Sequence, residues 1–201
     1  MIQIKVKFFQ LVAPFYEYVH FFGVSNFLSF VDKREFFRKD DVVLDLAGGT
    51  GRIAIKIVDK IKTVVIVDAS QKMLKECKKK VGIKCCYGYA EKIPFPEKYF
   101  DKIIIIDALH HFQDLSSVLL ELRRVLKDGG QIIVEEVTPK SIFGKFLILA
   151  ERILFMKSHF YSQNELKNIF EKYFETKIVK TNKSSYLLVA KLICLKNKNT
   201  T

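Results

Sequence analysis

The chain has 201 residues, of which 49% are hydrophobic and 28% are charged, and its formal net charge is +12. This size and composition predict one folded globular domain whose core needs no disulfide or metal. No apolar run reaches the roughly 18 residues that a membrane-spanning helix requires, and no small-residue cleavage site follows the basic, apolar N-terminus, so we expect a cytoplasmic protein. The positive charge is compatible with nucleic acid, an anionic membrane or an anionic substrate, although the lysines are scattered.

The cysteines and histidines show no metal-binding pattern. Cys77, Cys85, Cys86 and Cys194 form no CxxC pair, and no cysteine–histidine cluster has the spacing of zinc ligands. We therefore predict reduced, mostly buried thiols and no metal site.

Strands and helices alternate through the first two thirds of the chain. Residues 8–22 and 24–38 predict two helices with aromatic faces. Five apolar, β-branched segments then predict buried strands: DVVLDL (41–46), TVVIVDAS (63–70), GIKCCYG (82–88), FDKIIIIDAL (100–109) and QIIVEEV (131–137). Helices are expected between them, one opening at the glycines near Gly51, one capped by Ser70, and one stopped by the glycines of LKDGG. This alternation predicts a parallel sheet covered on both faces.

The pattern changes after Thr138. Residues 141–157 predict a long aromatic and aliphatic helix, and SQNE at 162–165 predicts a capping box that begins a helix at 162–172. Residues 174–181 and 184–194 predict an antiparallel hairpin at the sheet edge. We thus expect a Rossmann-like, doubly wound α/β fold: a mostly parallel seven-stranded sheet with an antiparallel C-terminal edge hairpin and a helical cap. The single domain 1–201 would comprise N-terminal cap helices (1–38), a cofactor-binding core (41–137), a cap or lid helix (140–160) and a C-terminal helix and hairpin (162–194).

The segment VVLDLAGGTG (42–51) predicts a ligand site where the first strand ends. Ligands of doubly wound sheets bind outside the carboxyl ends of the strands, and Gly48, Gly49 and Gly51 let main chain approach such a ligand closely. A helix beginning near Gly51 would direct its free N–H groups there. GTGRIA also matches a dinucleotide fingerprint, with Asp68 about 20 residues further on. Asp45 argues against a nicotinamide-dependent oxidoreductase, because a carboxylate repels a pyrophosphate but attracts an amino group or a sulfonium.

Four ordered motifs resemble those of a known family. They are VLDLAGGTGRIA (43–54), VVIVDASQKML (64–74), GYAEKIPFPEKYFDKIIIIDALHHF (88–112) and LRRVLKDGGQIIVEE (122–136). Together they resemble class I S-adenosylmethionine-dependent methyltransferases over roughly residues 8–190. DLAGGTG and VAPFYEYV (12–19) are similar to the ubiquinone/menaquinone biosynthesis C-methyltransferases of the methyltransferase type 11 branch.

The resemblance implies S-adenosylmethionine as the cofactor and assigns residues to its parts. Asp45 and the main chain of Ala47, Gly48 and Gly49 would hold the methionine end, and Asp68 would bind both ribose hydroxyls. The other implied cofactor residues are Gly51 in the glycine loop, Ala69 and Met73 beside the adenosine, Ala90 and Glu91 at the adenine, and Asp107 under the sulfonium. Tyr89 stands where relatives carry an aspartate, so adenine recognition would be altered.

The candidate catalytic residues follow the fourth and fifth strands. His110 and His111 are candidate bases because the unperturbed pKa of histidine is near 6.5, and Glu136 is a candidate because Glu135 and Glu136 end a strand and point to opposite sides. The structural alternatives are a histidine bound to backbone and a solvated carboxylate.

The cap regions suggest how an acceptor is bound. Tyr16 and Tyr161 are candidate lid or substrate residues, with a core aromatic as the alternative for Tyr16. Helix 141–157 is either a lid packed on the sheet or part of an apolar acceptor pocket near an anionic membrane, which would suit a prenylated substrate.

We therefore predict methyl transfer to a small-molecule or lipid-like acceptor such as a quinone precursor, with peripheral membrane contact. An RNA- or tRNA-directed methyltransferase is less favoured, because DALHH (107–111) lacks the Asn/Asp-Pro-Pro-aromatic loop. A non-catalytic cofactor-binding protein is the third alternative. The sequence predicts no oligomeric state.

Overall fold

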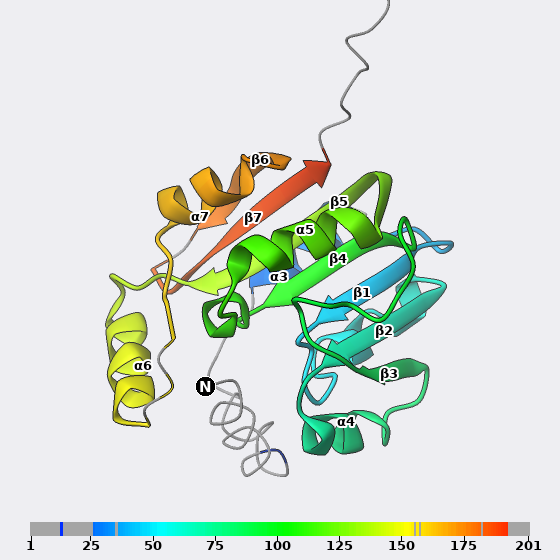
Figure 1. Ribbon diagram of the computed structural model, residues 1–201, viewed down its shortest axis with the longest axis horizontal. Coiled ribbons are helices and arrows are strands. Elements are labelled where there is room, and N and C mark those ends of the chain that lie inside the picture. Colours follow the sequence, from blue (N-terminus) through cyan, green and yellow to red (C-terminus); the bar gives the residue numbers. More distant parts are fainter. Residues whose placement is uncertain are drawn as a thin grey trace, which may run out of the picture.

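Seven strands form one mixed sheet in the order β3-β2-β1-β4-β5-β7-β6 in the part of the chain that the structure, a computed structural model, describes (Figure 1). The described residues are 13, 26–34, 36–154, 156, 158–181 and 183–192. The strands are β1 (Val42–Leu46), β2 (Thr63–Asp68), β3 (Ile83–Tyr87), β4 (Phe100–Ile106), β5 (Leu126–Val137), β6 (Phe174–Thr181) and β7 (Ser185–Leu192). β1 to β5 are parallel, β7 is antiparallel to β5, and β6 is antiparallel to β7. The predicted Rossmann-like fold with an antiparallel edge hairpin is confirmed.

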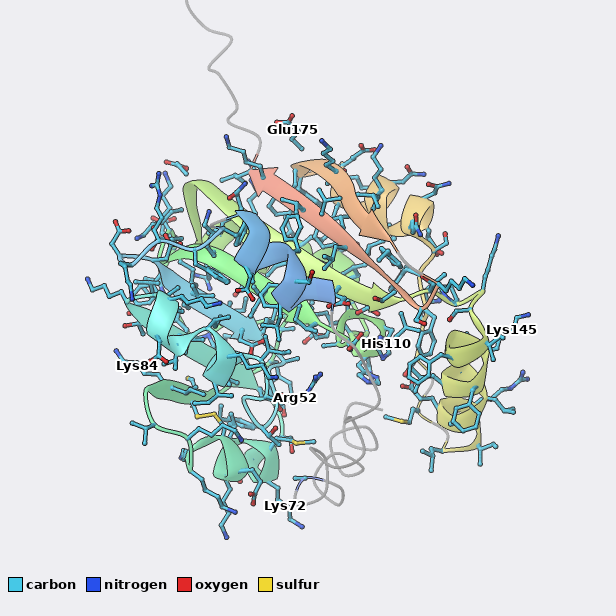
Figure 2. The ribbon with its side chains drawn as sticks, turned by 180° about the vertical axis from the view of Figure 1, so that it is seen from behind. Arg52, Lys72, Lys84, His110, Lys145 and Glu175 are labelled. Carbon is cyan, nitrogen blue, oxygen red and sulfur yellow. A yellow bond between two sulfur atoms is a disulfide. The ribbon has the colours of Figure 1, made fainter. Side chains whose placement is uncertain are left out.

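Helices cover both faces of this sheet, which is why its central strands are apolar throughout. α5 (Leu115–Val125) and α7 (Gln163–Phe170) pack on one face, and α3 (Asn26–Arg34) packs on the other (Figures 1 and 2). α4 (Gln71–Cys77) begins at the predicted N-cap Ser70, and the predicted capping box of α7 is present at Ser162 and Glu165. The strands β1 to β3 follow one another towards one edge of the sheet, and β4 then returns to the other side of β1. In doubly wound sheets, such a reversal of strand order places a crevice at the carboxyl ends of the two strands, here β1 and β4.

The prediction of an α-helix after the glycine loop is wrong. The chain there forms two short 3₁₀ turns, η3 (Ala54–Lys56) and η4 (Val58–Lys60). This segment is rich in β-branched residues, which lose side-chain freedom in an α-helix. Ile53, Ile57 and Ile61 are nevertheless buried, so their packing against the core holds the segment in place without a regular helix. The predicted helix N-terminus, with its free N–H groups directed at a ligand, is therefore not formed after Gly51 in the described structure.

The glycine stop predicted for the fifth helix is also wrong. α5 ends at Val125, because the carbonyl of Val125 accepts a hydrogen bond from Tyr99 N–H at 2.8 Å and the chain turns directly into β5. Gly129, with φ of 75°, and Gly130 lie in β5 instead. There the pairing with β4 shifts register between Phe100 and Lys102.

The helix predicted at 141–157 is shorter and exposes its apolar side chains. α6 (Ile142–Ile153) stands beyond the end of the sheet rather than packing on it (Figure 1). Among its described residues only Gly144 and Glu151 are buried. The exposed fractions reach 91% at Ile142, 69% at Phe146 and 66% at Ile153. The interpretation as a lid packed on the sheet is therefore wrong for this helix.

Two further findings concern the cysteines and the chain ends. Cys77 and Cys85 form a disulfide between α4 and β3, so the prediction that these thiols are reduced is wrong, and Cys86 is free.

The helix predicted at 8–22 falls outside the described residues apart from Ala13, and α3 covers part of the helix predicted at 24–38. No helix in the described ranges is long and apolar enough to cross a membrane.

Candidate cofactor and acceptor site

A cavity opens at the carboxyl ends of β1, β2 and β4. At the ends of β1 and β4, Ala47 (φ of 57°) and Asp107 (φ of 51°) adopt left-handed backbone conformations that are unfavourable for residues other than glycine. Such strain persists where surrounding structure imposes it, and it concentrates at functional sites. Eight of the predicted cofactor residues line this cavity: Ala47, Gly49, Asp68, Ala69, Met73, Ala90, Glu91 and Asp107.

Asp45 lies in a small recess adjoining this cavity, together with Gly48 and Arg52. Its side chain is 2% exposed, and within the described residues its Oδ2 has no hydrogen-bond partner. Burial, and secondarily the charge of Asp68, raise the pKa of Asp45 to about 7, while Arg52 opposes the rise. A Cβ atom on Gly48 would lie 2.6 Å from the Asp45 carboxyl carbon. Glycine is therefore required at 48 because a side chain would displace this carboxylate.

Asp68 ties the glycine loop to the end of β2. Its Oδ2 accepts a hydrogen bond from Gly49 N–H at 2.9 Å, and its Oδ1 accepts one from Ser70 N–H at 2.7 Å. Burial raises the pKa of Asp68, and these two bonds partly offset the rise. The Ser70 hydroxyl also accepts from Met73 N–H at 3.3 Å, so strand, loop and α4 hold one another in place. Gly51 does not line the cavity, and an added Cβ at this position would lie 3.2 Å from Ile66 Cδ1.

Tyrosine side chains lie at the part of the cavity where the resembled family carries a carboxylate. Tyr89 lines the cavity and is 38% exposed. Its hydroxyl lies 2.9 Å from the hydroxyl of Tyr87, and the two rings meet edge to face with centroids 5.8 Å apart. Tyr89 thus offers a ring face and a hydroxyl where the resembled family offers an acid.

Glu135 and Glu136 are both 1% exposed and point to opposite sides of β5. Glu135 accepts hydrogen bonds from Phe27 N–H at 3.0 Å and from the Ser185 hydroxyl at 2.9 Å, which ties α3 and β7 to β5. Glu136 accepts from Leu109 N–H at 2.7 Å and lies 2.7 Å from Nδ1 of His110. The alternative of a solvated carboxylate is therefore wrong for both residues.

His110 lies behind the cavity, whereas His111 lines it. Both belong to the 3₁₀ turn η5 (Leu109–His111). His110 is 2% exposed, stacks on Phe160 with ring centroids 4.5 Å apart, and its Nε2 lies 3.5 Å from Glu151 Oε1. Burial disfavours its charged form, but Glu136 and Glu151 outweigh burial and raise the pKa of His110 to about 10.

The sequence prediction missed Glu151. It is a buried acid in the apolar helix α6, and its Oε1 lies 3.9 Å from His111 Nε2. The sequence feature that could have indicated a buried role is that Glu151 is the one acid within the apolar segment FLILAERILF (146–155).

The predicted lid residues are not brought to the cavity by the described structure. Tyr16 lies outside the described residues. Tyr161 is half-buried against the core, does not line the cavity, and its carbonyl accepts a hydrogen bond from the Tyr186 hydroxyl at 3.0 Å. Both assignments stay predictions.

Sequence comparisons identify relatives of this chain. Residues 44–134 match the methyltransferase domain family. The chain is 34% identical over 167 residues to the ubiquinone/menaquinone biosynthesis C-methyltransferase UbiE of Francisella tularensis subsp. holarctica, covering 78% of this chain and 61% of the relative. It is 41% identical over 109 residues to the protein of the same name from Francisella philomiragia, covering 49% of this chain and 44% of the relative. The chain contains a class I S-adenosylmethionine-dependent methyltransferase domain.

Solved structures of such methyltransferases share the fold. A Thermotoga maritima S-adenosylmethionine-dependent methyltransferase superposes with a TM-score of 0.74 at 21% identity, covering 91% of this chain and 97% of that chain. The DhpI–SAM–HEP complex gives a TM-score of 0.74 at 15% identity, covering 95% of this chain and 97% of that chain. The chain spans about half the length of the curated relatives, with coverage of 44% and 61% in the two above.

The crevice fits the cofactor of class I methyltransferases. S-adenosylmethionine carries an ammonium and a sulfonium, and Asp45 offers a buried carboxylate oxygen that lacks a partner among the described residues. The Gly48–Gly49 main chain lies beside it, and Asp68 lines the adjoining cavity. These groups complement a cationic nucleoside better than an anionic dinucleotide.

Proposed function

We propose that the chain transfers the methyl group of S-adenosylmethionine to a small apolar or prenylated acceptor, of the quinone-precursor class. One observation carries the cofactor part: the buried Asp45 and the partly buried Asp68 both face one glycine loop, Asp45 beside Gly48 and Asp68 bonded to Gly49 N–H. The names of the curated relatives, C-methyltransferases of ubiquinone and menaquinone biosynthesis, support the acceptor class.

The chain's own residues would hold the cofactor and exclude water. Bound S-adenosylmethionine supplies an electrophilic methyl group on a positively charged sulfur. Asp45 would accept hydrogen bonds from the ammonium, and Asp68 would accept them from the ribose hydroxyls. Burial, followed by the charges of Glu135 and Glu136, raises the pKa of Asp107 to about 7, so a cation next to it would favour its ionised form. Much of the rate enhancement would come from positioning.

The acceptor would enter at the end of the cavity formed by Asp107, His111 and Phe112. His110 and Glu136, which the sequence predicts to be catalytic, would position the turn that carries His111. The nearby helix α6 presents exposed Ile142, Phe146 and Ile153. Because these apolar side chains are interspersed with Lys145 and Arg152, we propose that this helix contacts an anionic membrane that holds a prenylated acceptor.

A label-transfer assay tests this proposal. The purified chain is given S-adenosylmethionine with a labelled methyl group and three acceptor pools: prenylated quinol precursors in anionic vesicles, their short-chain soluble analogues, and bulk tRNA. We expect label in the quinol precursors, with faster transfer to the prenylated ones. A Phe146→Ser variant should lose vesicle binding and keep transfer to the soluble analogues.

Three results would contradict the proposal. Label in tRNA, together with RNA binding that weakens steeply with salt, would establish the nucleic-acid alternative. Cofactor binding without transfer across the panel would indicate a non-catalytic binding protein. A failure to bind S-adenosylmethionine at millimolar concentration would exclude both kinds of methyltransferase.

A further inference from the structure

Two histidines and a glutamate converge behind the acceptor end of the cavity. His110 and His111 come from η5, and Glu151 comes from α6. One ligand atom from each lies within 4.8 Å of the other two. Their side chains are 2%, 17% and 9% exposed, respectively. Figure 2 shows His110 between the end of the sheet and α6, whereas Lys145 lies on the outer side of that helix.

The far side of each imidazole is already bound. Nδ1 of His110 lies 2.7 Å from Glu136 Oε2, and Leu109 N–H holds the other oxygen of Glu136 at 2.7 Å. Nδ1 of His111 lies 3.1 Å from the Ser158 hydroxyl. Both Nε2 atoms are thereby directed towards Glu151 Oε1, at 3.5 Å from His110 and 3.9 Å from His111. Metal-binding histidines are oriented in this way, by a carboxylate or hydroxyl on the nitrogen that does not bind the metal.

The burial of Glu151 is an independent observation. The residue is 7% exposed, and its Oε2 is buried with no hydrogen-bond partner in the described ranges. Burying a carboxylate without full pairing is costly. Yet α6 turns Glu151 inward while Phe146, Leu149 and Ile153 stay exposed. Apolar burial alone would favour the opposite orientation, so a cation at the inward carboxylate would explain the orientation of the helix.

We propose that His110, His111 and Glu151 bind one divalent transition-metal ion, with Zn²⁺ as the best match. Two imidazoles and one carboxylate are a common ligand set for zinc sites that keep a fourth position open. Zinc ligands at 2.0–2.2 Å stand about 3.3–3.6 Å apart in a tetrahedron. The separations of 3.5 and 3.9 Å therefore require closure by at most about 0.6 Å, and the separation of the two histidine nitrogens, which is within 4.8 Å, requires closure by at most about 1.5 Å. Because His111 also lines the cavity, the open position would lie next to the acceptor. That an acceptor oxygen binds there rests on the proposed methyl transfer.

A proton on His110 is the alternative to a metal ion between the two histidines and Glu151. An imidazolium at His110, held between Glu136 and Glu151, would satisfy the same carboxylates without any metal. The two alternatives differ in metal stoichiometry, which can be measured directly.

Metal titration of the full chain tests the proposal. The protein is stripped with a chelator, dialysed, and titrated with Zn²⁺ by calorimetry and with Co²⁺ by visible absorption. We expect one bound ion per chain at micromolar metal and a Co²⁺ ligand-field band. Glu151→Gln and His111→Asn should each weaken binding by at least tenfold. His159→Asn should leave it unchanged, because His159 forms a similar pair with Glu165 at 3.0 Å but lies on the surface.

Two controls keep the result interpretable. Zinc should raise the melting temperature of the wild type and leave that of Glu151→Gln unchanged, and the metal-free variants should melt cooperatively. If Glu151→Gln does not fold, the partly exposed His111→Asn variant gives the same answer. Binding that survives both substitutions, or no binding at micromolar metal, would overturn the proposal. S-adenosylmethionine affinity is measured on the same samples, so cofactor binding without zinc binding rejects the metal site and leaves the proposed function intact.

Discussion

Replacing Asp45 with asparagine should make the free protein more stable. The carboxylate is 2% exposed and its pKa is raised from 3.8 to about 7, chiefly by burial and then by Asp68. Because the folded state binds this proton more tightly than the unfolded state, stability is lost as pH rises between these two values. The gap corresponds to at most about 4 kcal/mol at pH values above 7. Asparagine carries no charge, so the variant should lack this loss.

The same substitution should weaken cofactor binding. A hydrogen bond between charged groups contributes about 1.5–3 kcal/mol, so affinity for S-adenosylmethionine should fall about 10- to 150-fold. In the wild type, affinity should also fall as pH drops below about 7, because a protonated Asp45 no longer attracts an ammonium. Calorimetry gives the affinity, and urea unfolding at a series of pH values gives the stability.

A surface variant serves as the control for Asp45. Asp128→Asn removes an acid whose side chain is 61% exposed and which pairs with Lys98 at 2.8 Å, so it should change neither quantity measurably. Equal cofactor affinity of Asp45→Asn and the wild type, or lower stability of the variant at about pH 8, would contradict the role assigned to Asp45.

Three further substitutions give distinct expected outcomes. Gly48→Ala places a methyl group 2.6 Å from the Asp45 carboxyl carbon, so it should cost about 1–3 kcal/mol of stability and weaken calorimetric cofactor binding; tight binding would contradict the assigned role of the loop. Glu135→Ala removes the acceptor of the Phe27 N–H and of the Ser185 hydroxyl and should lower the free energy of unfolding by about 2–4 kcal/mol in urea, and a loss below about 1 kcal/mol would contradict the role of Glu135 in joining α3 and β7 to β5. Cys85→Ser opens the Cys77–Cys85 disulfide, whose sequence separation of 8 predicts a loss of about 2.5 kcal/mol relative to the oxidised wild type in urea; the reduced wild type should be as unstable as the variant, and equal stability of the variant and the oxidised wild type would contradict the prediction.

The sheet could be predicted because its signal is local. A strand such as Ile103–Ile106 is apolar on both faces only if both faces are covered, and the four isoleucines placed β4 correctly in the sheet. The capping residues Ser70 and Ser162 likewise bond within three residues of themselves. Such features need no knowledge of the rest of the chain.

What the sequence did not reveal depends on contacts between distant segments. The pairing of Tyr99 with Val125 ends α5 before its glycines, and the packing of α4 on β3 brings Cys77 to Cys85. The cluster of Glu151 with the two histidines requires α6 to fold back to the end of β4. The site acids Asp45 and Asp68 were predictable because each ends a strand at the known binding edge of this kind of sheet.

The most direct test of the account separates the two halves of the cofactor. Calorimetry compares S-adenosylhomocysteine, which keeps the ammonium, with methylthioadenosine, which lacks the amino-acid portion, on the wild type, Asp45→Asn and Asp68→Asn. We predict that Asp45→Asn weakens only S-adenosylhomocysteine, whereas Asp68→Asn weakens both ligands. Equal losses for both ligands in Asp45→Asn, or unchanged methylthioadenosine affinity in Asp68→Asn, would contradict the claim that these acids bind opposite ends of the cofactor.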